Sequence, residues 1–221
     1  KEKIKNFIYA SSSSVYGVKE ESIVNEDVEL NPLTDYSFYK AECEKILLES
    51  DSDNFITTIL RPATVCGYAP RQRLDVVVNI LTNFAYHKRK MTVFGDNQKR
   101  PNIHINDMAR AYYHILKSPN ELINNQIFNV GIDNKTVIEI ANLVKNIVGN
   151  DVNIIKETTN DNRSYHIDSS KIKRVLNFEF NYSISDAIND LVFAFENKLL
   201  SNTFKNEDYF NIKKMQSTNI K

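Results

Sequence analysis

The chain has 221 residues, 42% of them hydrophobic, which is enough to bury a core as one large domain or as a domain with a smaller lobe. Its 28 Lys and Arg residues balance 28 Asp and Glu residues, so no net charge directs it to nucleic acid or to an anionic membrane. No apolar stretch approaches the ~20 residues that cross a bilayer, and the first residues lack the layout of a signal peptide. We therefore expect a cytoplasmic protein whose partners include neither nucleic acid nor membrane.

The glycines and cysteines limit which cofactor and metal sites the chain can form. The five glycines lie far apart, so the chain has no Gly-rich phosphate loop and no dinucleotide-binding fingerprint of its own. The two cysteines, Cys43 and Cys66, fall in different predicted elements and show no zinc-type spacing with the four scattered histidines. We expect no metal site and two reduced, packed thiols.

The first elements are a strand and a helix. Residues 7–12, "FIYASS", predict a buried strand of aromatic and β-branched residues that ends where serines take over. An acidic, proline-containing loop follows over residues 18–35. From Thr34 or Asp35, "YSFYKAECEKILLES" has helical character, with an apolar stripe formed by Tyr36, Tyr39, Cys43 and Leu47.

The later elements alternate between strands and helices. Further strands are predicted over 55–65, 91–95, 101–105 and 126–131. A helix is predicted over 75–90, and a second begins at Asn106, whose side chain suits an N-cap. A third helix runs from the capping-box pair Thr136 and Glu139 to Gly149, and a fourth from Ser183 to about Leu200. Residues 201–221 are polar, and we expect them to be frayed or disordered. Strands that alternate with helices at this spacing predict βαβ units and a parallel sheet.

One pair of residues suggests chemistry. Tyr36 and Lys40 are four positions apart on a predicted helix, so they share a face, and an ammonium beside a phenol favours the phenolate needed for a general base. The spacing alone is weak, because it recurs in three other pairs: Tyr86 with Lys90, Tyr113 with Lys117, and Tyr209 with Lys213. Tyr36 differs in that it follows a buried strand ending in hydroxyls, and ligands of open α/β sheets bind at that end.

Five ordered blocks resemble a known family. "FIYASSSSVYG", "YSFYK", "LRPATVCG", "KRPNIHINDMARAY" and "IFNVG" look like the extended short-chain dehydrogenase/reductase superfamily, in particular its NAD-dependent nucleotide-sugar epimerases and dehydratases. The resemblance runs from residue 4 to about residue 199. It implies NAD as the cofactor, a nucleotide sugar as the substrate and a homodimer formed through the helix that carries the Tyr/Lys pair.

The resemblance also implies a fold. We expect an α/β fold that is the C-terminal part of a Rossmann-like, doubly wound parallel sheet with a small α/β substrate-binding lobe. Three strong strands are too few for the whole sheet, so the first βα units and the Gly-rich loop, roughly 100 residues, would be absent. The expected Rossmann-like part comprises 1–67 and 107–149, the substrate-binding lobe 68–106 and 150–200, and a polar tail 201–221.

By the same resemblance the catalytic residues are Ser12, Tyr36 and Lys40. Tyr36 would remove a proton from a sugar hydroxyl, Lys40 would hold the nicotinamide ribose and favour the phenolate, and Ser12 would donate to the reacting oxygen. Cofactor-binding positions would be Tyr36, Lys40, Ala10, Ser11 and Pro62.

Substrate binding should require cations, because a sugar nucleotide carries two phosphates that arginine can grip bidentately. Arg100 and Arg163 match positions where the family has phosphate-binding arginines, whereas Arg71 and Arg73 flank the expected sugar pocket without a clear family equivalent. The full set of expected substrate-binding residues is Ser12, Ser13, Thr64, Arg71, Arg73, Arg100 and Arg163. We expect structural roles for His104 and Asp107.

Two departures from the family pattern shape the functional prediction. Ser13 and Ser14 stand where dehydratases have an Asp-Glu pair, which disfavours dehydration, and Thr64 stands where many epimerases have a substrate-binding asparagine. The leading hypothesis is a nucleotide-sugar epimerase that oxidises C4 and returns the hydride to the other face. The alternatives are a 4-dehydrogenase or reductase that stops after one hydride step, which differs from the epimerase in whether NADH accumulates, and a dinucleotide-binding scaffold without catalysis. NADP in place of NAD also stays open, and we expect this chain alone to be inactive.

Overall fold

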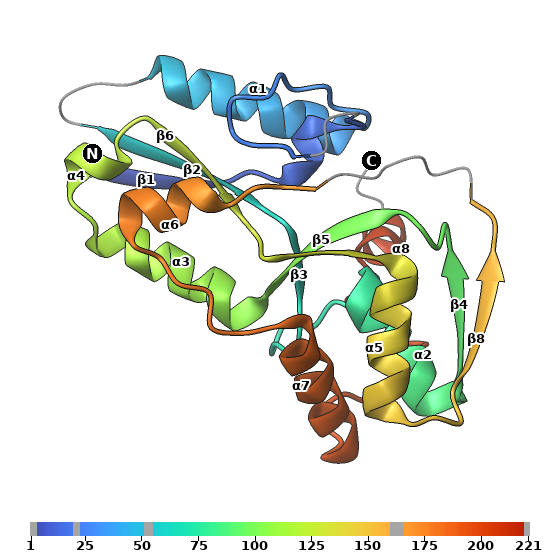
Figure 1. Cartoon of the computed structure of the whole chain (residues 1–221). Coiled ribbons are helices and arrows are strands. Elements are labelled where there is room, and N and C mark those ends of the chain that lie inside the picture. The colour runs from blue at the N-terminus through green and yellow to red at the C-terminus, as the bar shows by residue number, and fades with distance from the viewer. Residues whose placement is uncertain (1–3, 20–22, 51–54, 160–165, 219–221) are drawn as a thin grey trace.

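The computed structural model describes residues 4–19, 23–50, 55–159 and 166–218 as a mixed α/β protein (Figure 1). A parallel sheet in the order β1-β2-β6 is formed by β1 (Asn6–Ala10), β2 (Ile56–Pro62) and β6 (Gln126–Val130). Helix α1 (Asp35–Glu49) covers one face, and α3 (Ile105–Lys117) and α6 (Ser170–Leu176) cover the other, while the short α4 (Asn120–Ile123) leads into β6. This arrangement confirms the predicted α/β class with a parallel sheet.

The segment expected to be one strand over 55–65 is two strands in different sheets. β2 ends at Pro62, and β3 (Thr64–Cys66) pairs with β5 (Lys99–His104) in a second sheet. After Pro62, the Ala63 N–H still donates to the Val130 carbonyl at 2.8 Å, and the chain then turns into the second sheet. β7 (Asp133–Thr136) completes that sheet as an antiparallel partner of β5.

The rest of the chain forms a helical region beside a two-stranded ribbon. Helices α2 (Val77–Lys88), α5 (Val137–Val148) and α7 (Ile184–Glu196) pack together next to the parallel pair β4 (Lys90–Phe94) and β8 (Asn153–Glu157) (Figure 1). Their apolar cluster is built from branched and small side chains, among them Val78, Leu81, Met91, Ile140, Val144 and Ile188. The sequence grouped α5 with the first sheet, but its buried face lies on α2 and α7 because those helices supply the matching apolar surface.

Helix ends follow the expected chemistry with two corrections. The capping box of Thr136 and Glu139 is present. Helix α3 begins at Ile105, one residue before the predicted Asn106 cap, because the His104 ring accepts the Asn106 N–H at 3.1 Å and takes the cap position. Helix α7 ends at Glu196, short of the expected Leu200.

The apolar stripe predicted for α1 is wrong at its two tyrosines, whereas Cys43 and Leu47 are half-buried. The residues that α1 buries are Ser37 and Glu44, whereas Tyr36 is 59% exposed and Tyr39 is 66% exposed. The buried face therefore holds polar side chains, and the aromatic rings of the expected stripe face outward.

The C-terminal segment is more ordered than its polar composition suggests. It contains a short 3₁₀ turn, η2 (Glu207–Tyr209), and helix α8 (Asn211–Ser217). Tyr209 and Phe210 pack against a small apolar cluster around Leu74, and the Leu74 N–H donates to the Tyr209 carbonyl at 2.9 Å. Two aromatic side chains thus anchor a segment that we expected to be frayed. No described helix is long and apolar enough to span a bilayer.

Candidate active site

The predicted catalytic pair meets the end of β1 through Lys40. Its ammonium donates to the Ala10 carbonyl at 2.6 Å and lies 5.7 Å from the centre of the Tyr36 ring and 4.9 Å from that of Tyr9. Ala10 is the last residue of β1, so the Lys40 side chain links helix α1 to the carboxyl end of this strand. Tyr36 itself is exposed, which leaves its hydroxyl accessible to a ligand.

The four serines have different surroundings. Ser12 is the N-cap of a 3₁₀ turn, η1 (Ser13–Tyr16), where its hydroxyl accepts the Ser14 N–H at 3.1 Å and lies 2.8 Å from the Ser14 hydroxyl. Ser12 is half-buried, whereas Ser13 is buried. Ser11 is also buried and donates to the Glu44 carboxylate. Among the four, Ser12 and Ser14 are partly exposed, and Ser12 is the nearer of the two to the end of β1, two residues after Ala10.

A buried ion pair lies beneath these groups. Arg61 of β2 donates through Nε to both Glu44 oxygens at 3.1 Å and through one terminal nitrogen at 2.6 Å, and the two side chains are 4% and 2% exposed. Burial works against the charge on Arg61, but the hydrogen bond to Glu44 and the nearby acidic groups raise the pKa of the guanidinium above its usual value. Arg61 therefore stays charged at the end of the sheet.

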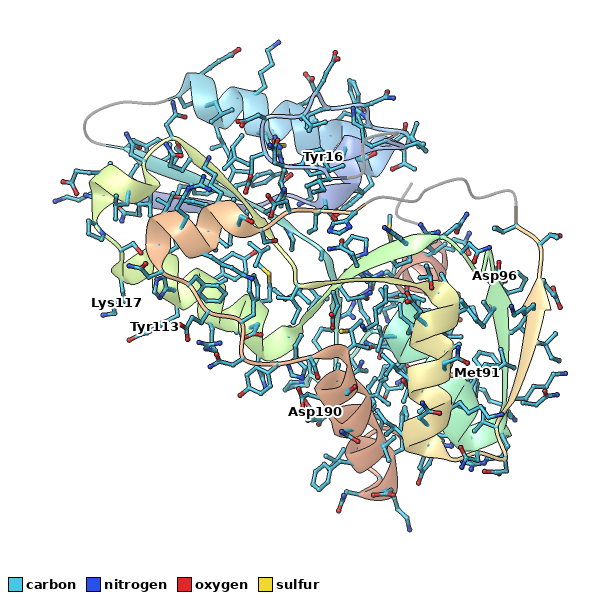
Figure 2. All side chains as sticks on the ribbon, viewed as in Figure 1. Tyr16, Met91, Asp96, Tyr113, Lys117 and Asp190 are labelled. Carbon is cyan, nitrogen blue, oxygen red and sulfur yellow. The ribbon has the colours of Figure 1, made fainter. Side chains whose placement is uncertain are left out.

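Hydrogen bonds connect this ion pair to β6 through Tyr16. Arg61 donates to the Tyr16 hydroxyl at 2.9 Å, which in turn donates to the Asn129 side chain of β6 at 2.7 Å (Figure 2 shows Tyr16 next to α1). Burial raises the pKa of Tyr16 to about 12 despite the opposing charge of Arg61. Glu26 accepts the Asn129 N–H at 2.7 Å, and burial raises the pKa of its carboxyl. These hydrogen bonds connect the carboxyl ends of β1, β2 and β6.

Pro62 and Thr64 lie where the chain passes from one sheet to the other. Pro62 ends β2 opposite Val130 of β6, and Thr64 begins β3 opposite Asn102 of β5. Both are half-buried. No hydrogen bond joins the described side chains of these two residues to Tyr36, Lys40 or Ser12.

Arg71 and Arg73 project from a loop between β3 and α2. Buried Gln72 fixes this loop by accepting the Ala69 N–H at 3.0 Å and donating to the Gly67 and Arg73 carbonyls at 3.2 and 2.8 Å. Arg71 donates to the Asn211 side chain of α8 at 3.2 Å, and Arg73 pairs with Asp75 at 2.9 Å. Both arginines are exposed and both have partners within the chain.

Arg100 lies on β5, close to an open cleft. Its guanidinium donates to the Gln98 side chain at 2.7 Å. The cleft has a volume of about 560 Å³ and is lined by Gly95, Asp96, Asn97, Gln98, Lys156, Glu157, Thr158 and Thr159, at the end of β4 marked by Asp96 in Figure 2. Arg163, the second expected phosphate-binding residue, lies outside the described residues.

The other Tyr/Lys pairs lie elsewhere. Tyr113 and Lys117 lie on α3, which covers the opposite face of the sheet from α1, with Nζ 5.6 Å from the ring centre (Figure 2). Tyr86 packs on Phe195, and Tyr209 packs in the Leu74 cluster. None of these pairs meets the carboxyl end of β1 within the described structure.

Sequence reasoning missed Glu44, Arg61, Tyr16 and Asn129. One signal was present: Arg61 interrupts the apolar run "FITTIL", and a charge inside a buried strand requires a partner. Its partner could have been sought one turn after Lys40 on the same helix. The role of Asn129 had no comparable signal, because its contacts come from segments distant in the sequence.

Known proteins are similar to this chain in sequence and in fold. Residues 1–131 match the sequence family described as the NAD dependent epimerase/dehydratase family. The chain belongs to this family. An uncharacterized UDP-glucose epimerase, YtcB, of Bacillus subtilis is 30% identical over 189 residues, which is 84% of this chain and 58% of that protein. The UDP-glucose 4-epimerase of Lactobacillus helveticus is 27% identical over 197 residues, covering 80% of this chain and 59% of that protein.

A solved epimerase/dehydratase structure shows the same fold. The UDP-glucose 4-epimerase of Thermotoga maritima, crystallised with UDP-glucose, superposes with a TM-score of 0.78 at 26% identity and covers 89% of this chain and 65% of its own. The chain thus spans between 58% and 65% of the lengths of these relatives. The Rossmann-like expectation and the family prediction are confirmed.

The residues at the end of β1 fit one end of the dinucleotide that the family uses. An ammonium has three N–H donors, so Lys40 can hold the Ala10 carbonyl and still bind the hydroxyls of a nicotinamide ribose. Ala10 and Tyr36 are exposed beside it, and Ser12 is half-buried. For the pyrophosphate, the described residues offer no Gly-rich turn.

Proposed function

We propose that the chain carries the catalytic residues and the sugar-nucleotide lobe of an NAD-dependent nucleotide-sugar epimerase that acts at C4. The observation that carries the proposal is Lys40, which contacts both the last carbonyl of β1 and the face of the Tyr36 ring. This contact supports the proposal because it joins a phenol and an ammonium to the end of a parallel strand, two residues before Ser12, and open α/β sheets bind ligands at that end.

Each residue then has a stated part in the reaction. NAD, when bound, accepts a hydride from the sugar carbon and returns it. Tyr36 takes the proton of the sugar hydroxyl, and the positive charge of Lys40 favours the phenolate that this step requires. Ser12 donates a hydrogen bond to the same sugar oxygen, and Lys40 also holds the nicotinamide ribose. A positioned base of this kind contributes about 10² to 10⁴ in rate.

The substrate lobe supplies cations for the two phosphates of a sugar nucleotide. Arg100 lies beside the cleft at the end of β4, and Arg71 and Arg73 project from the loop fixed by Gln72. Arg163 remains part of the proposal on sequence alone. Ser13 and Thr64 complete the predicted contacts, with Ser13 buried at the start of the turn η1 and Thr64 at the start of β3.

The alternative reaction is a single oxidation or reduction at C4, and the remaining alternative is a scaffold without catalysis. The absence of an Asp-Glu pair after Ser12 favours epimerisation over dehydration. The homodimer stays a prediction that rests on α1, where Ile46 is 61% exposed.

Tyr36→Phe tests the proposal, with Tyr39→Phe as a control because Tyr39 is a neighbouring exposed phenol on the same helix. In the full-length product of the gene, supplied with NAD and a UDP-hexose, Tyr36→Phe should abolish epimerisation and leave sugar-nucleotide affinity nearly unchanged, since it removes a group that acts in the transition state. Tyr39→Phe should retain turnover. Normal turnover by Tyr36→Phe would exclude Tyr36 as the base, and NADH accumulation by the wild type would favour the dehydrogenase.

A further inference from the structure

Helix α1 is held on the sheet in an unusual way. The residues that it buries are Ser37 and Glu44, whereas three large apolar side chains, Phe38, Tyr39 and Ile46, are 48%, 66% and 61% exposed. Ala41 adds a partly buried methyl group to this interface. Helices α3 and α5, by contrast, bury mainly apolar side chains. Cys43, Leu47 and Leu48 are also half-buried, so the two side chains that α1 buries fully are the polar ones.

Glu44 supplies most of the polar contacts between α1 and the sheet. Its two carboxylate oxygens accept hydrogen bonds from Nε and a terminal nitrogen of Arg61 and from the Ser11 hydroxyl. Ser11 follows directly after β1 and Arg61 lies within β2, so one side chain of α1 is bound to two neighbouring strands. With both charges nearly fully buried, the bidentate geometry is both strong and demanding in orientation.

These contacts constrain the position of α1 more tightly than apolar packing would. A slip of one residue along a helix moves every side chain by about 1.5 Å and turns it by about 100°. Hydrogen bonds lose most of their strength under such changes, whereas the hydrophobic effect has no preferred direction. Lys40 lies one turn before Glu44 and Tyr36 lies two turns before it, so the position of Glu44 determines where both of them meet β1.

We propose that Glu44 is a positioning residue, whose ion pair with Arg61 and hydrogen bond from Ser11 set the rotation and translation of α1 and thereby place Tyr36 and Lys40 against the end of β1. Its consequence for catalysis rests on the function proposed above. The placement of the helix is a property of the fold and can be tested without catalysis. The continuation of the pair to Tyr16 and Asn129 ties this placement to all three strands.

The two cysteines allow a direct test in the full chain. Cys43 lies next to Glu44 on α1 and is half-buried, so its reaction with a thiol reagent such as DTNB reports local movement of this helix. Cys66 is 1% exposed in the second sheet, and burial raises the pKa of its thiol to about 12, so it reacts only when the protein opens globally. Cys66 is therefore an internal control for unfolding.

Glu44→Gln should label Cys43 at least about tenfold faster than the wild type while Cys66 stays protected, because the buried guanidinium loses its ionic partner. The double variant Glu44→Leu/Arg61→Leu should recover the urea midpoint, since apolar residues can replace a buried pair, but should keep fast labelling of Cys43. Ser11→Ala should cause a smaller increase. Glu42→Gln, which removes an exposed carboxylate from the same helix, should label like the wild type.

Two kinds of result would overturn the proposal. Slow, wild-type labelling of Cys43 in Glu44→Gln, or in the double variant, would mean that apolar contacts hold α1 equally well. Parallel acceleration of Cys43 and Cys66 would mean that Glu44 serves only global stability. Should Glu44→Gln fail to fold, the double variant and Ser11→Ala decide the matter by the same comparison of the two thiols.

A separate measurement distinguishes failure of this inference from failure of the proposed function. If the labelling pattern is as expected but the full-length product of the gene shows no turnover, the proposed function fails and the positioning role stands. In an active full-length protein, Glu44→Leu/Arg61→Leu should lower kcat at least about tenfold with the KM for the sugar nucleotide within about twofold. An unchanged kcat would overturn the consequence for catalysis.

Discussion

Helix α1 and the helices at the other end of the molecule are held in place by opposite means. At the carboxyl end of the first sheet, α1 is attached through the buried pair of Glu44 and Arg61 and the hydrogen bonds that continue to Tyr16. Around α2, α5 and α7, the contacts are made by apolar side chains such as Ile140 and Ile188. Apolar burial supplies stability without specifying orientation, whereas a buried ion pair adds little net stability and in some proteins specifies geometry, the role proposed here for Glu44. The difference places the precise contacts where catalysis is proposed.

The largest expected effect tests the polar end. Arg61→Met leaves the Glu44 carboxylate buried without its cation, and removing one partner of such a pair typically costs about 3–5 kcal/mol. The free energy of unfolding in urea measures the loss. Arg174→Met on the exposed face of α6 is the control and should have little effect. A loss below about 1 kcal/mol for Arg61→Met would show that the pair does not specify this end of the sheet.

The apolar end should respond to the loss of volume. Ile188 of α7 is fully buried in the α2, α5 and α7 cluster, and Ile188→Ala should cost about 2–5 kcal/mol through lost transfer energy and the cavity left behind. Ile188→Val removes a single methylene group and should cost about 1 kcal/mol. Urea unfolding of both variants checks this graded response. Equal costs for the two would mean that the cluster is not closely packed.

The contrast between apolar and polar contacts also explains which elements could be predicted from the sequence. Apolar periodicity is visible along a chain, so helices such as α2 and α5 and the strands β4 and β6 were predicted close to their observed bounds. The stripe on α1 was predicted wrongly at its two tyrosines because the fully buried side chains of this helix are polar. A pattern of hydrophobicity cannot reveal a face formed by Ser37 and Glu44.

The candidate site was predictable only in part, for a similar reason. Tyr36, Lys40 and the serine turn stand within 30 residues of one another, and their motifs could be read directly. Asn129 and Glu26 reach the same place from segments about 100 residues apart, and no local pattern links them. The C-terminal segment was expected to be frayed because composition averages over the two aromatic residues, Tyr209 and Phe210, that anchor it.

A smaller effect is expected at the N-terminus of α7, where the apolar end also has polar contacts. The Ser183 hydroxyl accepts the Asp186 N–H at 3.2 Å, and Ser183→Ala should cost about 1 kcal/mol. Hydrogen bonds from the Ser183 N–H and hydroxyl hold the pKa of Asp186 below its usual 3.8. A lowered pKa stabilises the folded state above the usual value, and that stability is lost as the pH falls through the lowered one. Asp186→Asn should therefore flatten the fall in stability below about pH 4, measured by urea unfolding, and an unchanged slope would contradict it.

The smallest effect sharpens the comparison most, because it repeats the chemistry of Arg61 and Glu44 at the surface. Arg89, which follows α2, donates to Asp151 through two nitrogens, with Nε 2.7 Å from one oxygen, but the side chains are 41% and 65% exposed. Water and salt screen such a pair, so Asp151→Asn should shift the urea midpoint less than Ser183→Ala does, and the shift should vanish in 1 M salt, where the Debye length is about 3 Å. The loss caused by Arg61→Met should persist at the same salt concentration, since its pair is buried. Matching salt dependence for the two variants would mean that burial does not distinguish these ion pairs, and the contrast between the two ends of the molecule would fail.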